Sequence, residues 1–364
     1  MNKLIKKLLL VLLILGSAFL IISCGKNKDE DESIITEYNG NAVKEYTIHT
    51  ELQAEYLSKG YEYATLYGKG KEELSKPQGI EIDFSDIISD STSYEFYLDL
   101  SDKFDNARIY NTTEKKVTLY NLMIMKVYYY KVKTSVSESE VYAFVVKEAM
   151  IRNLDIDGVT NARDVGGYKV DGKRINQGLL YRMSKFNEDE SLELLITDQG
   201  INELVNVLKV KTELDLRQTD DNEYGGLTSS PLGDSVKYIN LPMTSGGNCI
   251  LLNKDELKDL FKILGDESNY PLVFHCSIGT DRTGMVSFLA LNLLGVSRDE
   301  IYYDYLFSNF APIGRVRLAS TIDDYYRTIE DAKGKTDKEK TYNYLLSVGV
   351  DKKDLDKFIN IMTK

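Results

Sequence analysis

The stretch "HCSIGTDRTG" (275–284), which follows the apolar run "PLVF", is the strongest indication of fold in the second half of this chain. It separates a strand signal, "YPLVFHC", from a helix signal, "RTGMVSFLALNLLG", that ends at Gly295. A glycine-containing loop between a strand and a helix can point successive backbone N–H groups at an anion. The spacing places Cys276 at the end of the strand and Arg282 in the first turn of the helix. The stretch therefore predicts an anion cradle above a cysteine.

The chemistry of this cradle follows from Cys276 and Arg282. Inward N–H groups, the helix dipole and the guanidinium all favour a thiolate over a thiol. The planar guanidinium can bind two phosphate oxygens at once, and a thiolate below them can attack phosphorus to form a phosphocysteine. Two alternatives stay open here, a structural cysteine in a tight turn and a disulfide with Cys249. The G-x4-G-K-[ST] spacing of a nucleotide-binding loop is absent from the sequence.

Alternating strand and helix signals from about residue 150 onward predict an α/β sheet with helices on its faces. The expected strands besides "YPLVFHC" are "TELDLR" (212–217) and "SVKYINLPM" (235–243). Two capping boxes mark expected helix starts, Asn253 with Glu256 and Ser297 with Glu300. The segment "KDLDKFINIM" near the end of the chain carries the apolar stripe of a further helix.

The residues of the opening stretch resemble the cysteine-dependent phosphatase signature H-C-x5-R-[ST]. In the detailed form H-C-x-x-G-x-D-R-T-G, the stretch is similar to the atypical bacterial tyrosine phosphatases, some of which also hydrolyse phosphoinositides. Other stretches follow in that family's order: "DGVTNARDVGGY" (157–168), "GLLYRMS" (178–184), "TELDLRQTDDNEY" (212–224) and "YYDYLFSN" (302–309). The resemblance covers residues 150–364 and implies the α/β cysteine-phosphatase fold, a central sheet flanked by helices.

The resemblance also implies a role for each residue of the signature. Cys276 matches the nucleophile, His275 the residue that orients it, and Thr283 the hydroxyl that stabilises the departing thiolate. Arg282 matches the phosphate-binding arginine. The implied substrate-binding positions are Ser277, Ile278, Gly279, Thr280, Arg282 and Thr283. Arg163 and Asp164 are expected to brace the same loop region.

The general acid is expected to be Asp281, the aspartate directly before the signature arginine, because an alcohol leaving group needs a proton. A loop-bracing role for this carboxylate is the alternative. Asp215 is the second candidate for the acid. Arg217 is expected to pair with Asp215 or with Glu223. The mechanism implied by the family needs no metal and no cofactor.

The substrate class turns on Thr280, because phosphoinositide-active relatives often carry lysine there, in the form "GKDR". The missing cation favours phosphotyrosine on proteins, with phosphoinositides or inositol phosphates as the alternative. The net charge of -12 disfavours polyanions and nucleic acids. A catalytically dead surface binding protein is a further alternative, and the intact pair of Cys276 and Arg282 speaks against it.

The first half of the chain, residues 43–148, is expected to be an all-β sandwich that precedes the phosphatase domain. Its tyrosine-rich strand signals, separated by polar turns, are "GIEIDF" (79–84), "YEFYLDL" (94–100), "KVTLYNL" (116–122), "VYYYKVK" (127–133) and "VYAFVV" (141–146). The later strands loosely resemble a fibronectin type III domain. We expect strands from 43 to 147, and no partner of this sandwich follows from the sequence.

The N-terminus is similar to a bacterial lipoprotein signal peptide, predicted over residues 1–23. Three lysines precede an uncharged run from Leu8 to Ile22, and "IISC" resembles a lipobox that ends in Cys24. The resemblance implies a lipid, palmitate included, on Cys24 and an anchor in the bacterial cell membrane that faces outside the cytoplasm. Cleavage takes the net charge from -12 to -15, and residues 24–42 are expected to form a flexible tether.

A location outside the cytoplasm exposes a reactive thiolate to oxidants. We therefore hypothesise that Cys276 is switched off reversibly, with Cys249 as the expected partner.

Overall fold

The computed structural model describes residues 35–187, 195–220, 224 and 226–364. Its second half is built on a five-stranded sheet in the order β10-β13-β16-β14-β15. The strands are β10 (Arg163–Asp164), β13 (Leu180–Met183), β14 (Thr212–Asp215), β15 (Lys237–Asn240) and β16 (Leu272–His275). Strands β13 to β16 run parallel, and β10 is antiparallel to β13. Because β16 lies in the middle, the residue after it emerges at the centre of the sheet edge.

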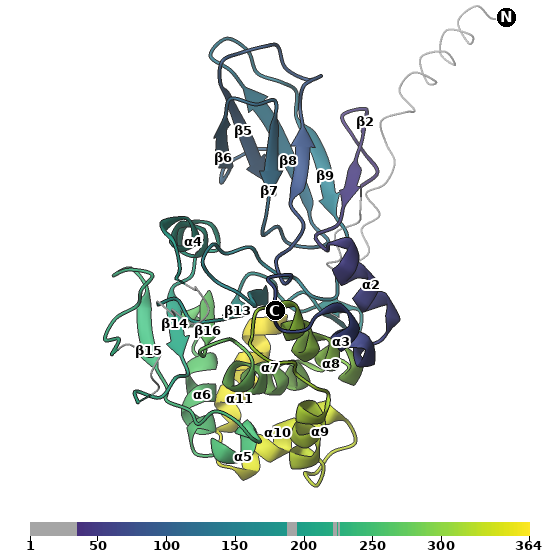
Figure 1. Cartoon of the computed structure of the whole chain (residues 1–364). Helices are drawn as coiled ribbons and strands as arrows, with labels where there is room; N and C mark the ends of the chain where they lie inside the picture. The colour runs from purple at the N-terminus through teal and green to yellow at the C-terminus, as the bar shows by residue number, and fades with distance from the viewer. Residues whose placement is uncertain (1–34, 188–194, 221–223, 225) are drawn as a thin grey trace, which may run out of the picture. The chain divides into compact units, whose positions relative to one another are not determined.

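Helices and short turns surround this sheet (Figure 1). They are α4 (Asp198–Asn202), η2 (Glu203–Val207), α5 (Cys249–Leu252), α6 (Glu256–Leu264), η4 (Glu267–Asn269), α7 (Asp281–Leu294), α8 (Arg298–Phe307), η5 (Ser308–Phe310), α9 (Ser320–Ile329), α10 (Asp337–Ser347) and α11 (Lys352–Thr363). Strand β16 shows why both sheet faces are covered: Leu272 and Phe274 join the core that includes α7, whereas Val273 joins a second core with Leu204. The α/β arrangement predicted from the sequence is confirmed.

The helix-start predictions had mixed outcomes. Ser297 and Glu300 form the expected capping box at the start of α8. The prediction for Asn253 was wrong, because α6 begins only at Glu256 and Asn253 follows the short helix α5. The Asn253 side chain instead bonds the N–H and the carbonyl of Thr244 at 2.6 and 3.0 Å. A side chain that ties down a loop in this way is not free to cap a helix.

The first half contains two β-sheets around one core. One has the order β3-β9-β8-β5-β6, and the other pairs β4 with β7. The strands are β3 (Lys44–Tyr46), β4 (Ile80–Asp83), β5 (Tyr94–Asp99), β6 (Arg108–Thr112), β7 (Lys116–Leu119), β8 (Val127–Lys133) and β9 (Tyr142–Val146). Inward side chains from both sheets, such as Ile82 and Phe96, share that core. The five quoted strand signals are confirmed, and β3 and β6 match none of them.

The prediction of strands throughout residues 43–147 was wrong for one segment. Residues 51–67 form α2 (Glu51–Lys59), η1 (Tyr61–Tyr63) and α3 (Ala64–Tyr67). Thr50 and Gln53 make a complete capping box at the start of α2, a signal present in the sequence. The Tyr56 ring packs 5.3 Å from the rings of Tyr303 and Phe310, so this segment belongs to the core of the α/β half.

A small hairpin of β1 (Glu37–Tyr38) and β2 (Asn41–Ala42) lies inside the range expected to be a flexible tether. Asn39 and Gly40 both have positive φ, 50° and 77°, as a two-residue hairpin turn requires.

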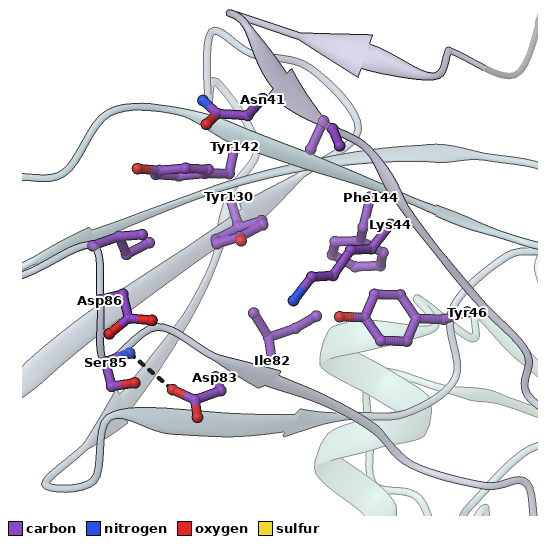
Figure 2. A pocket seen from close by; sticks show the side chains of 13 residues that line it. Asn41, Lys44, Tyr46, Ile82, Asp83, Ser85, Asp86, Tyr130, Tyr142 and Phe144 are labelled. Carbon is purple, nitrogen blue, oxygen red and sulfur yellow. Dashed lines mark hydrogen bonds between the residues drawn. The ribbon is translucent and has the colours of Figure 1, made fainter.

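Next to this hairpin, a pocket of about 350 Å³ opens between β3 and β4, with Lys44 and Tyr46 among its lining side chains (Figure 2). Among the described residues, no helix is long and apolar enough to cross a membrane.

Candidate active site

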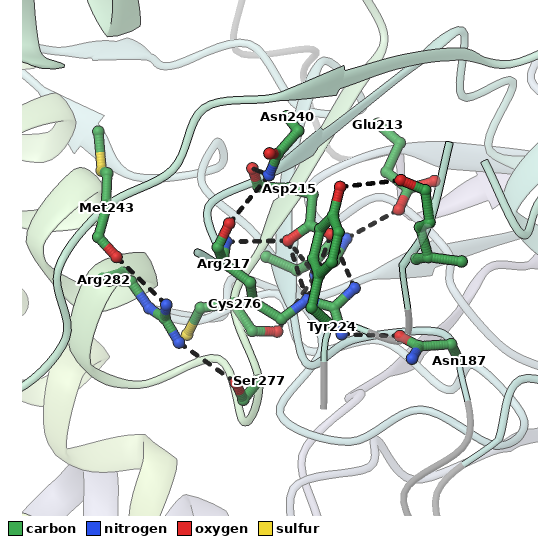
Figure 3. A network of polar contacts seen from close by, with 12 residues as sticks. Asn187, Glu213, Asp215, Arg217, Tyr224, Asn240, Met243, Cys276, Ser277 and Arg282 are labelled. Carbon is green, nitrogen blue, oxygen red and sulfur yellow. Dashed lines mark hydrogen bonds and ion pairs between the residues drawn. The ribbon is translucent and has the colours of Figure 1, made fainter. Parts of the chain in front are cut away.

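Cys276 lies between the end of β16 and the N-terminus of α7, as the sequence predicts. We call residues 276–282 the cysteine loop. The Arg282 guanidinium lies beside the thiol (Figure 3), and its Nη1 and Nη2 donate to the Met243 carbonyl and the Ser277 hydroxyl, both at 3.2 Å. These two bonds fix the guanidinium plane over the loop, so its position does not depend on a bound anion.

The environment of Cys276 favours its thiolate. Burial alone would raise the pKa of the thiol, but the Arg282 charge and the neighbouring Thr283 hydroxyl and N–H outweigh burial. The net pKa therefore lies below its ordinary value. Because the thiolate is the nucleophilic form, Cys276 has the electrostatics of a reactive cysteine rather than a structural one.

The carbonyls of Ile278 and Gly279 point away from the inner side of the loop, toward the surrounding protein. The Gly279 carbonyl accepts from Arg182 Nη2 at 2.8 Å and from Asn161 Nδ2 at 2.9 Å, and the Ile278 carbonyl accepts from the same amide at 3.2 Å. Gly279 has φ 70°, and a Cβ there would lie 2.6 Å from the Met183 carbonyl oxygen. With the carbonyls held outward, the opposite side of the loop is left to the N–H groups that an oxyanion needs.

His275 supports the loop from below. Its Nε2 lies 2.9 Å from a Glu213 carboxylate oxygen, and its Nδ1 lies 3.1 Å from the Cys276 carbonyl. Burial would lower the pKa of His275, but the carboxylates of Asp215 and Glu213 outweigh burial and raise it. An imidazolium satisfies both acceptors at once, which agrees with an orienting role and not with a catalytic base.

The side chains of Glu213, Asp215 and His275 place ligand-type atoms within 4.8 Å of one another. Donors already occupy these oxygens, because Ser230 binds Glu213 and Arg217 binds Asp215. The carboxylates of Glu213 and Asp215 therefore form part of a hydrogen-bonded network (Figure 3).

Asp215 is poorly placed to be the general acid. It is fully buried and accepts from Arg217 Nη2 at 2.7 Å and from the Tyr238 hydroxyl at 3.0 Å. Burial would raise the pKa of Asp215, but the charges of His275 and Arg217 outweigh it and lower the pKa. A carboxylate held ionised and away from solvent has no proton for a leaving group. The expected pairing of Arg217 with Asp215 is confirmed, and Glu223 lies outside the described residues.

Asp281 begins α7 and is partly exposed. Its carboxylate oxygens lie 3.2 Å from Arg317 Nε and 3.4 Å from Arg317 Nη2. The same Nη2 donates to the Thr280 hydroxyl at 2.8 Å, so the Thr280 side chain faces Arg317. Of the two candidate acids, only Asp281 lies on the cysteine loop with a partly exposed carboxylate.

Arg163 reaches the loop region through Asn161, whose side-chain oxygen accepts from Arg163 Nη1 at 2.5 Å. Arg163 also shares the buried Asp304 carboxylate with Arg182, at 2.8 and 2.6 Å. Asp164 faces a different region: it accepts from the side chain of Arg152 and from the N–H groups of Gly166 and Gly178. The expectation of a bracing role near the loop therefore fits Arg163 and not Asp164.

Four residues at the site were not assigned from the sequence: Asn161, Arg182, Asp304 and Arg317. The first three lie in stretches that were quoted for the family resemblance, and a buried charge network is invisible to local pattern. Arg317 lies outside every quoted stretch.

Both described cysteines are free thiols, and burial raises the pKa of Cys249 to about 11. Cys24 lies outside the described residues.

Comparison with known proteins places residues 154–363, more than half of the chain, in the tyrosine phosphatase family. A candidate tyrosine-protein phosphatase of Cupriavidus necator is 26% identical over 183 residues, which are 43% of this chain and 63% of that protein. A tyrosine-protein phosphatase of Nostoc commune is 34% identical over 56 residues, which are 15% of this chain and 19% of that protein. The chain thus spans less than two thirds of either relative.

Two solved structures are similar at low scores. Pseudomonas aeruginosa TpbA in complex with phosphotyrosine has 16% identity and a TM-score of 0.30, covering 47% of this chain and 86% of that one. The core catalytic domain of the S. cerevisiae PP-IP phosphatase SIW14 has 20% identity and a TM-score of 0.29, covering 40% and 77%. These scores carry no argument about this chain.

Proposed function

Because this chain belongs to the tyrosine phosphatase family, we propose that it is a protein-tyrosine phosphatase that acts through a phosphocysteine on Cys276. The observation that carries the proposal is the placement of the Cys276 thiol before the N-terminus of α7 and beside the Arg282 guanidinium, which lowers its pKa. Outward carbonyls of the cysteine loop support it, because they leave the N–H groups for the equatorial phosphate oxygens.

The proposed reaction has two steps. The Cys276 thiolate attacks phosphorus, the S–P bond forms, and the P–O bond breaks while Asp281 protonates the departing phenol oxygen. Water then attacks the phosphocysteine, Asp281 takes a proton from that water, and the S–P bond breaks to release phosphate. The Thr283 hydroxyl stabilises the departing thiolate, and Arg282 binds two phosphate oxygens throughout.

Turnover of p-nitrophenyl phosphate and of a phosphotyrosine peptide tests this function. We expect Cys276→Ser to reduce both to the background rate, because a serine hydroxyl is not ionised at neutral pH. Cys249→Ser is the matched control, since its hydroxyl can keep the bond from Sγ to the Gly246 carbonyl. Wild-type activity in the Cys276→Ser variant, or none in the wild type, would sink the proposal.

A phosphoinositide or inositol-phosphate substrate is the second candidate. Arg317 favours it, because this guanidinium adds a cation beside Thr280, where a lysine is missing. A ratio of kcat/KM for phosphoinositide vesicles over phosphotyrosine peptides distinguishes the two. The main proposal expects the peptides to be the better substrates, and a ratio above one would reverse the order.

We further propose that the protein is an exported lipoprotein of the bacterial cell membrane, with a lipid on Cys24 and its domains outside the cytoplasm. The "IISC" stretch supports this. The sandwich would serve as a fibronectin type III-like spacer or docking module. Pairing of β4 with β7, and the order β9-β8-β5-β6, support that likeness. Cys24→Ala is expected to abolish palmitate labelling and release the protein from the membrane fraction.

A further inference from the structure

One segment of the N-terminal half has contacts at each of its two ends with residues that hold the cysteine loop in place. We call residues 68–75 the bracing segment. It lies between α3 and β4, and it precedes the matched family region, which begins at residue 154. The segment does not touch the loop itself. Its Ser75 end is linked to the loop through Asn161, and its Gly70 end is linked through Asn309 and then Arg317.

The first end is reached through Asn161. The Ser75 hydroxyl accepts from the Asn161 N–H at 3.2 Å, and the Asn161 side chain donates to the carbonyls of Ile278 and Gly279. Asn161 has φ 58°, a left-handed conformation that asparagine tolerates better than most residues. Because one residue makes both sets of bonds, a shift of Ser75 moves the amide that holds the loop carbonyls outward.

The Glu73 carboxylate fixes this contact. It accepts from the Ser75 N–H at 2.9 Å, from the Ser75 hydroxyl at 2.6 Å and from the Thr160 hydroxyl. Thr160 directly precedes Asn161 in the chain. The bracing segment is thus hydrogen-bonded to two adjacent residues, Thr160 and Asn161.

The second end is reached through Arg317. The Asn309 carbonyl accepts from the Gly70 N–H at 2.8 Å, and the Asn309 side chain bonds the N–H and carbonyl of Arg317 at 2.7 and 3.0 Å. Arg317 in turn contacts Thr280 and Asp281. A Cβ on Gly68 would lie 2.5 Å from the Asn309 carbonyl oxygen, so the segment packs against this support without spare room.

The bracing segment is itself held by buried side chains. Gln53 Nε2 donates to the carbonyls of Leu74 and Lys76 at 2.7 and 2.8 Å, and Asn153 Nδ2 donates to the Ser75 carbonyl at 2.7 Å. Gln53 and Asn153 are both buried. A displacement of the segment is therefore passed on to its contacts and not absorbed by solvent.

From these contacts we propose that the bracing segment, although outside the matched family region, positions the cysteine loop for the reaction, with Ser75 and Gly68 as positioning residues. The proposal rests on the phosphatase function proposed above. A catalytic group misplaced by about 1 Å can cost about a hundredfold in rate. The segment therefore acts on the rate of the chemical step more than on substrate binding.

The test uses the full chain with Ser75→Ala and the matched control Ser58→Ala, whose hydroxyl bonds only the Glu55 carbonyl of its own helix. We expect Ser75→Ala to lower kcat for p-nitrophenyl phosphate about tenfold or more, with KM nearly unchanged. We also expect alkylation of Cys276 by iodoacetamide to shift to higher pH. Ser58→Ala should change neither. Equal kcat and alkylation profiles in the two variants would overturn the proposal.

Gly68→Ala is the second variant. The Gly68 backbone does not have positive φ, and the added Cβ would press on the peptide between Asn309 and Phe310. We expect it to lower kcat in parallel with Ser75→Ala while the Tm stays above the assay temperature. A loss of kcat that only tracks the unfolded fraction in both variants would show a purely structural role and contradict the proposal. Failure of the phosphatase assignment is separate, since it appears in the wild type and in Cys276→Ser.

Discussion

Arg317 Nη2 donates to the Thr280 hydroxyl at 2.8 Å, and its Nε lies 3.2 Å from the Asp281 carboxylate. A guanidinium from the loop before α9 thus stands beside the position where phosphoinositide-active relatives carry lysine. A cation from a distant part of the chain therefore lies beside the cysteine loop. Arg317 is almost fully buried, which suits it to hold Asp281.

Replacement of Arg317 should affect poor leaving groups most. Arg317→Met removes the partner of Asp281, and proton donation matters more for a phenol of high pKa than for p-nitrophenol. We expect kcat for phenyl phosphate to fall about tenfold more than kcat for p-nitrophenyl phosphate. Arg317→Lys keeps the charge and should recover part of the loss. Equal losses on both substrates would argue against a role through Asp281.

The two candidate acids are expected to behave differently when neutralised. Asp281→Asn should lower kcat for a phosphotyrosine peptide by about a hundredfold or more while the fold stays intact. Asp215→Asn should mainly destabilise the protein, by about 3–5 kcal/mol, because it leaves a buried guanidinium without its carboxylate. Urea unfolding and leaving-group dependence measure the two effects. The reverse pattern would make Asp215 the acid.

The fall in activity on the acidic side of the pH profile should reflect protonation of the Cys276 thiolate. Its lowered pKa keeps the thiolate at pH values below about 8.5, the ordinary midpoint of a cysteine, and activity is lost as pH falls through the lowered value. Thr283→Ala removes a polar group that lowers the pKa of Cys276, so the acidic limb of the profile should move to higher pH.

The two buried cysteines should also differ in reactivity. Burial raises the pKa of Cys249 to about 11, so iodoacetamide at neutral pH is expected to modify Cys276 and spare Cys249, as mass spectrometry can determine. The oxidation hypothesis makes a further prediction: a disulfide between the two under mild oxidant. Its absence in non-reducing mass spectrometry would remove Cys249 from that hypothesis.

Asp304 should contribute pH-dependent stability. Burial would raise the pKa of Asp304, but Arg163 and Arg182 outweigh burial and lower it. The contribution is fully present above the unfolded value of about 3.9 and is lost as pH falls through the lower folded value. Asp304→Asn is therefore expected to cost about 3–5 kcal/mol at pH 7, and the difference should shrink below pH 4 in urea unfolding.

The matched control for this prediction is Asp337→Asn, which breaks the exposed pair with Arg298. Because water screens that pair, the change should cost no more than about 1 kcal/mol. A similar cost for Asp304→Asn would mean that the buried network does not hold the fold.

Much of the fold was readable from local pattern. Alternating apolar and aromatic residues predicted the five quoted strands of the first half, and Ser297 with Glu300 predicted the start of α8. The errors arose where local signals compete. Asn253 has the spacing of a cap but ties a loop, and the capping box of Thr50 was overlooked within a strand-rich region.

The cysteine loop could be predicted from the sequence alone, because the strand end, Gly279, Cys276 and Arg282 all lie within ten consecutive residues. The contacts that hold that loop were visible only in the folded structure. Asn161 lies 118 positions from Gly279, and Ser75 lies 86 positions from Asn161. Such contacts depend on how the elements pack, which no local periodicity encodes. The same reason explains why Arg317, which contacts Thr280 and Asp281, could not be found from the sequence.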